Sequence, residues 1–280
     1  GILELSKNFL QLNVYGDEPI LTHFPMKQYP FAVLPYIISL FFSYQLFGQH
    51  PTKSSSFKLD TLQLFDSARS RTIPVAYYSP LQKNEKQQLV IFSHGYGANK
   101  GGDYLAYSYL TEFLASKGYF VASIQHELPT DSLMPTQGIP QVVRKPFWER
   151  GIENIRFVMN TLRKSHPYLD FRHITLSGHS NGGDMTALFA QNHPEKIARI
   201  ITLDNRRVAL PRTAKPRIYS LRSSDQAADE GVLPTPEEQI KFGMTIIKLP
   251  NTIHNDMDDN ANAVQRKEIQ DVFLKLLQER

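Results

Sequence analysis

The stretch HITLSGHSNGGDMTALF, residues 173–189, decides the fold of this chain. Its centre, Gly178-His179-Ser180-Asn181-Gly182, matches the pattern G-x-S-x-G between an apolar run and a helical pattern. A tight strand-to-helix turn lifts the Ser180 hydroxyl off a sheet, and the flanking glycines remove side chains that would collide there. The backbone N–H of Asn181 then lies free at the amino end of a helix, where it can stabilise an oxyanion. An ordinary glycine turn has the same letters, but the position between strand and helix favours a nucleophilic serine.

Short apolar runs and longer helical patterns alternate along most of the chain. We predict strands over residues 62–65, 73–78, 89–92, 119–124, 174–176, 197–203, 217–221 and 244–249, and helices over 103–116, 148–163, 181–191 and 263–277. The first two runs, joined by the polar residues SARSR, indicate a β-hairpin. The alternation predicts an α/β fold with a mostly parallel central sheet and helices on both faces. Because ligands bind beyond the carboxyl ends of such strands, reactive side chains are expected just after them.

A second glycine turn, Ser93-His94-Gly95-Tyr96-Gly97, directly follows one of these strands. Its glycines let the backbone approach a reacting carbonyl group closely. We therefore predict the N–H of Tyr96 as the second oxyanion donor, beside that of Asn181.

A nucleophilic serine needs a base and an orienting acid, which after such a turn follow in the order Ser, Asp or Glu, His. His254 follows a predicted strand in a short loop, whereas His193 lies at the end of a predicted helix. We therefore expect His254 to be the base. Two acids satisfy the order and follow strands: Asp225, which we prefer, and Asp204, the alternative. The one that is not the acid is expected to have a structural role.

These features resemble the α/β-hydrolase superfamily over about residues 62–277. Within it, the chain is most similar to dienelactone-hydrolase-like and platelet-activating-factor acetylhydrolase-like serine esterases. The matching residues are Ser93-His94-Gly95-Tyr96-Gly97, the turn at Ser180, Leu203-Asp204 and Asn251-Thr252-Ile253-His254.

The resemblance implies the α/β-hydrolase fold, but its branches imply different acids. The commonest acid position in the superfamily points to Asp225, and the acetylhydrolase branch points to Asp204. Dienelactone hydrolases proper use a cysteine nucleophile, and this chain has no Cys, so their substrates do not carry over.

The predicted reaction is ester hydrolysis through an acyl-enzyme on Ser180, with His254 as base and with no metal or organic cofactor. Two alternatives stay open: an inactive binding or regulatory protein on the same fold, and an acyltransferase that uses the same triad. The motif in residues 256–262 lacks the glycine and glutamate of a calcium loop, so we expect its aspartates to cap the last helix.

The long segment over residues 125–147 is expected to cover the site, with His126 and Met134 contacting the substrate. If basic residues gather at the mouth of the site, an anionic leaving group becomes plausible. The candidates are Arg144, Lys145, Arg150, Arg206, Arg207 and Arg212. A lipid or other small ester is the expected substrate class.

Composition and the N-terminal part of the chain complete the prediction. We divide the 280 residues into an N-terminal segment, 1–56, and a catalytic domain, 57–280. Phe31 to Phe47 is the most apolar stretch; we favour a packed helix there, with a lid or an element at a membrane surface as the alternative. The net charge of +4 is smaller than the clustered positive charge that is typical of a nucleic-acid-binding protein. The chain opens with Gly1, which fits an exported protein with a removed leader but leaves the compartment open.

Overall fold

A computed structural model describes residues 56–279, with the exception of residue 83. The predicted apolar helix at Phe31 to Phe47 lies outside these residues, as does all but the last residue of the N-terminal segment 1–56.

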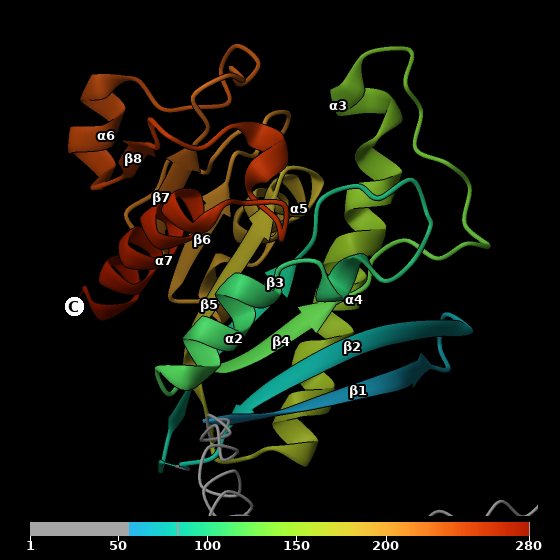
Figure 1. The fold of residues 1–280 in the computed structure, drawn as a ribbon. Helices are drawn as coiled ribbons and strands as arrows, with labels where there is room; N and C mark the ends of the chain where they lie inside the picture. The colour runs from blue at the N-terminus through green and yellow to red at the C-terminus, as the bar shows by residue number, and fades with distance from the viewer. Residues whose placement is uncertain (1–55, 83, 280) are drawn as a thin grey trace, which may run out of the picture. The chain divides into compact units, whose positions relative to one another are not determined.

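One eight-stranded sheet forms the centre of the described part, in the order β1-β2-β4-β3-β5-β6-β7-β8 (Figure 1). The first two strands pair antiparallel, β2 also runs antiparallel to β4, and all other neighbours are parallel. This confirms the predicted hairpin and the mostly parallel sheet. The strands are β1 (Phe57–Asp66), β2 (Arg71–Pro80), β3 (Gln87–Ser93), β4 (Phe120–Ile124), β5 (Leu169–His179), β6 (Arg199–Leu203), β7 (Arg217–Arg222) and β8 (Thr245–Lys248).

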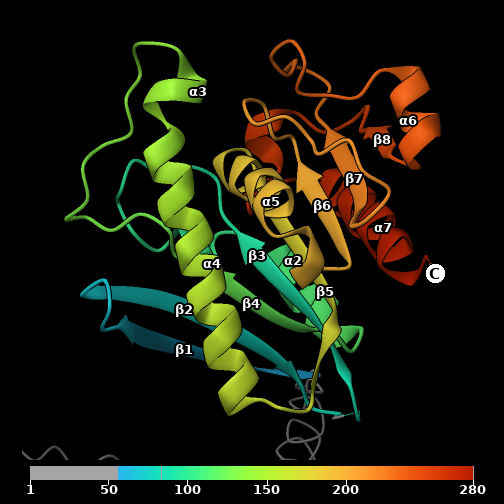
Figure 2. The ribbon, with the colours of Figure 1, turned by 180° about the vertical axis from the view of Figure 1, so that it is seen from behind.

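Helices cover both faces of the sheet, as predicted. The helices α2 and α7 lie on one face and α4 and α5 on the other (Figures 1 and 2). The α-helices are α2 (Ser108–Ser116), α3 (Pro140–Val143), α4 (Lys145–Ser165), α5 (Asn181–Asn192), α6 (Pro236–Phe242) and α7 (Ala263–Gln278). Short 3-10 helices span η1 (Asp103–Leu105), η2 (Pro194–Lys196) and η3 (His254–Asp256).

The apolar run in β3 explains how two cores form on one sheet. Leu89 and Ile91 join the cluster beneath α4 and α5, while Val90 and Phe92 join the cluster beneath α2 and α7. Because successive side chains of a strand point to opposite faces, a strand buried on both faces is apolar throughout. Removing this apolar surface from water is the main driving force for the arrangement.

The helix predicted over residues 103–116 is interrupted in the structure. Asp103 begins the 3-10 helix η1, and the α-helix starts only at Ser108. The carboxylate of Asp259 accepts hydrogen bonds from the first two backbone N–H groups of α2, at 3.0 Å each. An acid distant in sequence thus caps this helix, while Asp103 accepts a hydrogen bond from the Gln125 side chain at 2.9 Å.

The aspartates of residues 256–262 also differ from the prediction that they cap the last helix. Asn262 caps α7, and Gln265 completes the capping box by accepting from the backbone N–H of Asn262. In the described part of the chain, no group of three or more His, Asp or Glu side chains could hold a metal ion.

Candidate active site

The turn at Ser180 is the first element of the site. Ser180 links β5 to α5 with a φ of 51° and a ψ of −115°, a backbone conformation that costs energy for any residue with a side chain. A Cβ on Gly178 would lie 2.3 Å from the Gly182 carbonyl oxygen, and one on Gly182 would lie 2.2 Å from the Ser93 carbonyl oxygen. Both glycines are therefore required for β3, β5 and α5 to meet tightly enough to present Ser180.

Three side chains from the carboxyl ends of β5 and β6 and from the loop after β8 form a hydrogen-bonded row. The Ser180 hydroxyl lies 3.0 Å from Nε2 of His254, and Nδ1 of His254 lies 2.5 Å from Oδ2 of Asp204. Asp204 is fully buried and His254 is 7% exposed. With the Nδ1 proton donated to the carboxylate, Nε2 is the free acceptor that can receive the serine proton.

Asp204 is held in its ionised form by its surroundings. Burial alone would raise the pKa of this carboxyl, but hydrogen bonds from His254 and Ser223 and the charge of Arg222 outweigh it and lower the pKa. Arg222 lies 2.8 Å from Oδ1, and Ser223 donates its backbone N–H to Oδ1 and its hydroxyl to Oδ2. Sequence reasoning missed Arg222 and Ser223, because two residues at the end of β7 gain this role only from the pairing of β6 with β7.

The preferred acid, Asp225, does not contact the imidazole of His254 as predicted, but contacts its backbone. Its Oδ1 accepts the backbone N–H of His254 at 2.7 Å, whereas the imidazole of His254 faces Asp204. The hydrogen-bond geometry therefore favours the alternative, Asp204, over the preferred Asp225 as the partner of the His254 imidazole. The physical reason is that Asp225 is bonded to the backbone of His254, while Arg222 and Ser223 hold the carboxylate of Asp204 beside the ring.

Of the two residues predicted as oxyanion donors, Asn181 directly follows Ser180 and Tyr96 lines the same cavity as Ser180. Asn181 is the first residue of α5, so its backbone N–H has no acceptor within the helix. Its side chain is fixed from two sides: Nε1 of Trp148 donates to Oδ1 at 2.8 Å, and Nδ2 donates to Glu127 at 2.9 Å. Tyr96 lines the same cavity as Ser180, and its hydroxyl accepts the backbone N–H of Met134 at 2.9 Å.

Tyr107 and His179 connect two parts of the site, the loop that contains Tyr96 and the turn at Ser180. The Tyr107 hydroxyl accepts the backbone N–H of Gly95 at 2.9 Å and lies 2.8 Å from Nδ1 of His179. Burial, followed by the neighbouring His254, lowers the pKa of His179 to about 3. The unprotonated Nδ1 of His179 therefore accepts a hydrogen bond from the Tyr107 hydroxyl, and the ring proton stays on Nε2. Neither residue was singled out from the sequence, because their contact joins segments 72 positions apart.

The cavity at Ser180 has a volume of about 300 Å³. Its walls come from the Tyr96 loop, η1 and the loop after β8; the described lining residues are Gly95, Tyr96, Gly97, Asp103, Ala106, Tyr107, His179, Ser180, His254, Asn255, Asp258 and Asn260. Small, polar walls of this kind suit a compact substrate with hydrogen-bonding groups.

The predicted substrate contacts are not among these lining residues. His126 is 1% exposed, with its Nε2 2.9 Å from the Ser93 hydroxyl, and burial lowers its pKa so that it stays neutral. Met134 is 4% exposed and contacts Tyr96 through its backbone N–H. His126 contacts Ser93 and His94, and Met134 contacts Tyr96, so both residues support the segment that carries Tyr96.

The six candidate basic residues do not gather at the cavity either, and five of them are engaged by nearby side chains. Arg207 pairs with Asp229, Arg212 with Glu238, Arg150 with Asp131 and Lys145 with Glu149, while Arg206 donates to Gln226 and Arg144 to the Pro135 carbonyl. The expectation of an anionic leaving group depended on basic residues at the mouth of the site, and none of the described residues that line the cavity beside Ser180 is a Lys or Arg.

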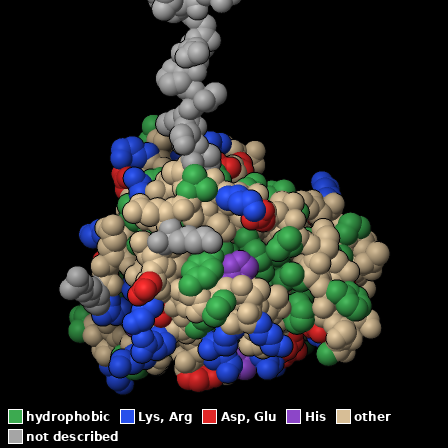
Figure 3. All heavy atoms as spheres, turned by 90° about the horizontal axis from the view of Figure 1, so that it is seen from below, with side chains coloured by type: hydrophobic (Ala, Val, Ile, Leu, Met, Phe, Trp, Pro, Cys, Tyr) green, Lys and Arg blue, Asp and Glu red, His purple; other side chains and the backbone are tan. Residues whose placement is uncertain are grey.

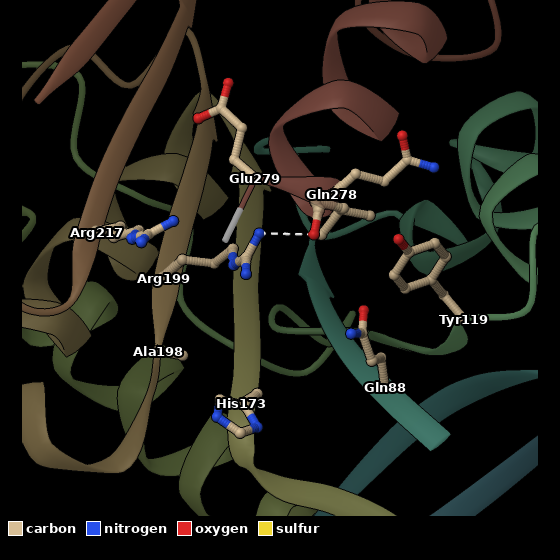
Figure 4. A pocket seen from close by; sticks show the side chains of 9 residues that line it. Gln88, Tyr119, His173, Ala198, Arg199, Arg217, Gln278 and Glu279 are labelled. Carbon is tan, nitrogen blue, oxygen red and sulfur yellow. Dashed lines mark hydrogen bonds between the residues drawn. The ribbon is translucent and has the colours of Figure 1, made fainter. Parts of the chain in front are cut away.

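A larger cavity of about 580 Å³ lies at the other end of the parallel strands (Figure 4). Arg199 and Arg217, the first residues of β6 and β7, line it, and Arg199 donates to the Leu277 carbonyl at the end of α7 at 2.8 Å. In Figure 3, which shows the described residues from below, basic side chains lie among hydrophobic, neutral and acidic ones. Because Ser180 follows the carboxyl end of β5, this cavity is remote from the row of Ser180, His254 and Asp204.

Comparisons with known proteins agree with the fold. Residues 52–133 match the sequence profile of the family described as platelet-activating factor acetylhydrolase, isoform II. The matched part includes the Tyr96 loop and ends before Ser180. The predicted resemblance to acetylhydrolases is confirmed over these residues.

Solved esterase structures superpose on most of the chain. Esterase Est22 has a TM-score of 0.58 at 13% identity, with 81% of this chain and 83% of that chain covered. A bacterial heroin esterase has a TM-score of 0.55 at 14% identity, with 89% of this chain and 92% of that chain covered. A fungal esterase from Rhizomucor miehei has a TM-score of 0.59 at 14% identity, with 90% of each chain covered.

At these identities the structural likeness establishes the fold alone. Among the described helices, none is both long and apolar enough to cross a membrane. The described part of the chain therefore has the α/β-hydrolase fold, and residues 52–133 are similar to platelet-activating factor acetylhydrolase, isoform II.

Proposed function

We propose that the chain hydrolyses small carboxylic esters through a Ser180–His254–Asp204 triad. The observation that carries the proposal is the unbroken row of hydrogen-bonding atoms from Ser180 Oγ through both nitrogens of His254 to Asp204, at 3.0 and 2.5 Å. A serine hydroxyl is a weak nucleophile by itself and is activated by a base that a third group orients.

In the first half-reaction, Ser180 Oγ attacks the ester carbonyl carbon while its proton passes to Nε2 of His254. The negative charge that forms on the carbonyl oxygen is stabilised by the N–H groups of Tyr96 and Asn181. The bond to the alcohol then breaks, and His254 gives its proton to the departing oxygen. The products of this half are the free alcohol and an acyl group on Ser180.

In the second half-reaction, water attacks the acyl-enzyme and His254 takes the proton of the water. The tetrahedral intermediate collapses, the acid leaves, and the proton returns to Ser180. Asp204 stays ionised throughout and stabilises the imidazolium that forms twice per turnover. The lowered pKa of Asp204 supports this role, because protonation would remove the stabilising charge.

The cavity supports a small substrate rather than a long acyl chain. A volume of about 300 Å³ lies at the lower end of the range for small-molecule pockets. The match to the acetylhydrolase family points in the same direction, toward a short acyl group.

The test is steady-state hydrolysis of p-nitrophenyl acetate, butyrate and octanoate by the wild type and by Ser180→Ala and His254→Ala. Both variants are expected to lose at least about 10⁴-fold in kcat, and the acetate is expected to be the best substrate of the wild type. Ser116→Ala and His173→Ala are matched controls, because they remove the same groups from the exposed end of α2 and from the exposed side of β5. Wild-type activity retained by Ser180→Ala would contradict the proposal.

A further inference from the structure

The edge strand β1 has one side of its backbone that no other described strand pairs with. It is the first strand in the order of the sheet, and Figures 1 and 2 show it at the rim, with no described strand beyond it. On its inner side it pairs with β2 over ten consecutive residues without a register shift. The outer side of such a strand offers a row of N–H and C=O groups to another strand.

The neighbouring pairings determine which residues of β1 carry these outward groups. The backbone N–H of Leu81 donates to the Ser56 carbonyl at 3.1 Å, in register with the ladder between β1 and β2, so even-numbered positions of β1 bond to β2. Pro74, which lies opposite Gln63, instead accepts the N–H of Gln125 just after β4, at 2.9 Å. Because bonded and non-bonded pairs alternate in an antiparallel ladder, positions 59, 61, 63 and 65 direct their backbone groups outward.

The strand lacks the features that usually protect such an edge. Residues 57–66 contain no Pro, and their pairing has no bulge. The only cation of the strand, Lys58, lies 2.7 Å from Asp60. Three apolar side chains, those of Leu59, Leu62 and Phe65, are 40% to 61% exposed. Edges of sheets are commonly guarded by Pro, bulges or charges, so a long, regular and apolar edge is suited to bind another strand.

The sequence of β1 restricts how it could pair with a second copy of itself. Two copies related by a two-fold axis run antiparallel, and their outward groups meet only if the axis passes through a residue rather than between two residues. An axis at Asp60 brings Asp60 opposite itself, and an axis at Gln63 brings Asp60 opposite Asp66; like charges in these positions are destabilising. An axis at Thr61 places Lys58 and Asp60 opposite leucines. An axis nearer either end of the strand shortens the paired region.

An axis at Leu62 matches every exposed apolar side chain of the strand with another. Leu62 then faces Leu62 of the other copy, and Leu59 faces Phe65 on both sides of the axis. Lys58 faces Asp66, whose carboxylate also binds Arg69. The outward backbone groups pair as 59 with 65 and 61 with 63. Opposite pairs of apolar side chains, and of opposite charges, stabilise antiparallel strands.

We propose that two copies of the chain bind each other through β1, antiparallel about a two-fold axis at Leu62, and so join their sheets into one. The partner that this surface fits is therefore a second copy of the same chain. The inference does not depend on the proposed function, because none of the described residues that line the cavity at Ser180 belongs to β1.

The absence of cysteine from the sequence allows a direct crosslinking test. In Leu62→Cys the thiols of two copies lie opposite each other in a non-hydrogen-bonded pair, whose Cα atoms are about 4.5 Å apart and within the range of a disulfide. Phe65→Cys is the matched control on the same strand, because its two copies are about 20 Å apart in this arrangement. With oxidised glutathione, most of Leu62→Cys and almost none of Phe65→Cys should become a covalent dimer on a non-reducing gel.

Thr61→Pro tests the backbone hydrogen bonds while leaving the fold intact. The N–H of residue 61 points outward, so Pro removes no bond to β2 but removes the bond to the carbonyl of residue 63 in each half of the dimer. Sedimentation velocity of the full chain is expected to show a concentration-dependent dimer for the wild type. In Thr61→Pro the dissociation constant should rise at least about tenfold, with an unchanged circular dichroism spectrum.

Three results would overturn the inference. A wild-type chain that sediments as a monomer at every concentration, with no disulfide in Leu62→Cys, would show that a second copy does not bind at this edge. A dimer that Thr61→Pro leaves unchanged would place the interface elsewhere on the molecule. Faster crosslinking of Thr61→Cys than of Leu62→Cys would place the axis at residue 61 and contradict the register.

Discussion

Asp204→Asn is the substitution that tests the arrangement of the site in most detail. Oδ1 of Asp204 faces two donors, the guanidinium of Arg222 and the backbone N–H of Ser223, and neither of them can accept a hydrogen bond. Oδ2 faces the Ser223 hydroxyl, which can rotate, and Nδ1 of His254. The new amide must therefore place its oxygen at the Oδ1 position and its NH₂ group at the Oδ2 position.

This orientation reverses the tautomer of His254. The NH₂ group of the substituted side chain would donate to Nδ1, so the imidazole proton would move to Nε2, where it faces Ser180. An Nε2 that already carries a proton cannot accept the serine proton. The corresponding change in a serine protease lowers kcat by about 10⁴-fold, which is about 5.5 kcal/mol of transition-state stabilisation. We expect a loss of the same order here.

Asp225→Asn provides the contrast. The amide oxygen of the new residue can still accept the backbone N–H of His254, so we expect less than about a threefold change in kcat. The assay is p-nitrophenyl acetate hydrolysis between pH 6 and pH 9, with circular dichroism to confirm that both variants are folded. A crippled Asp225→Asn beside a nearly active Asp204→Asn would refute the reasoning from the hydrogen-bond geometry.

Three further predictions follow from the same structure. Gly182→Ala should lower the free energy of unfolding by more than about 4 kcal/mol in urea titrations, because its Cβ would lie 2.2 Å from a carbonyl oxygen. Gly243→Ala has open space around its Cβ at a φ of 63° and should lower the free energy of unfolding by only about 1 kcal/mol. Equal losses in the two variants would contradict this prediction. Tyr107→Phe leaves a backbone N–H unpaired and should lower kcat about tenfold to hundredfold with KM nearly unchanged, and an equal rise in KM would point to substrate binding instead. Burial raises the pKa of Asp184 to about 6 despite three backbone hydrogen bonds, so its ionisation costs stability as the pH rises from the value of a free aspartate through that value. The stability of Asp184→Asn relative to wild type should therefore grow by about 2 kcal/mol between pH 4 and pH 7, and a constant difference would argue against it.

Local sequence was sufficient for the sheet, because its determinants are local. Each parallel strand is an apolar run bounded by polar or glycine residues, and the hairpin of β1 and β2 is joined by a short polar turn. The helix α6 escaped prediction, since it buries no residue and depends on a capping box at Thr235 rather than on an apolar face. The early start predicted for α2 was wrong, because the acid that caps it, Asp259, is about 150 positions away.

The residues of the candidate site likewise divide into those that a local motif predicts and those that depend on distant contacts. Ser180, Tyr96 and Asn181 could be predicted because each lies in a short glycine motif directly after an apolar run. The choice between Asp204 and Asp225 could not be made from the sequence, because both follow strands at the same edge of the sheet. It depends on how the His254 loop meets the end of β6 and on the donors, Arg222 and Ser223, that lie beside Asp204 at the end of β7.

The substrate side of the site was the least predictable. Six basic residues in the sequence suggested an anionic leaving group, but long flexible cations pair with whichever carboxylate lies nearby, as Arg207 does with Asp229. The groups that line the cavity instead include Asp103 and Asp258, which no local motif distinguishes from surface aspartates. Such contacts depend on where three separate loops meet.

The most direct test of the central claim is covalent labelling with a fluorophosphonate probe, followed by intact-mass measurement and peptide mapping. We predict one adduct per chain, located on Ser180 and absent from Ser180→Ala, because only a serine activated by His254 reacts at a useful rate. A folded wild-type protein that takes up no probe, or an adduct that persists in Ser180→Ala, would contradict the assignment of Ser180 as the nucleophile.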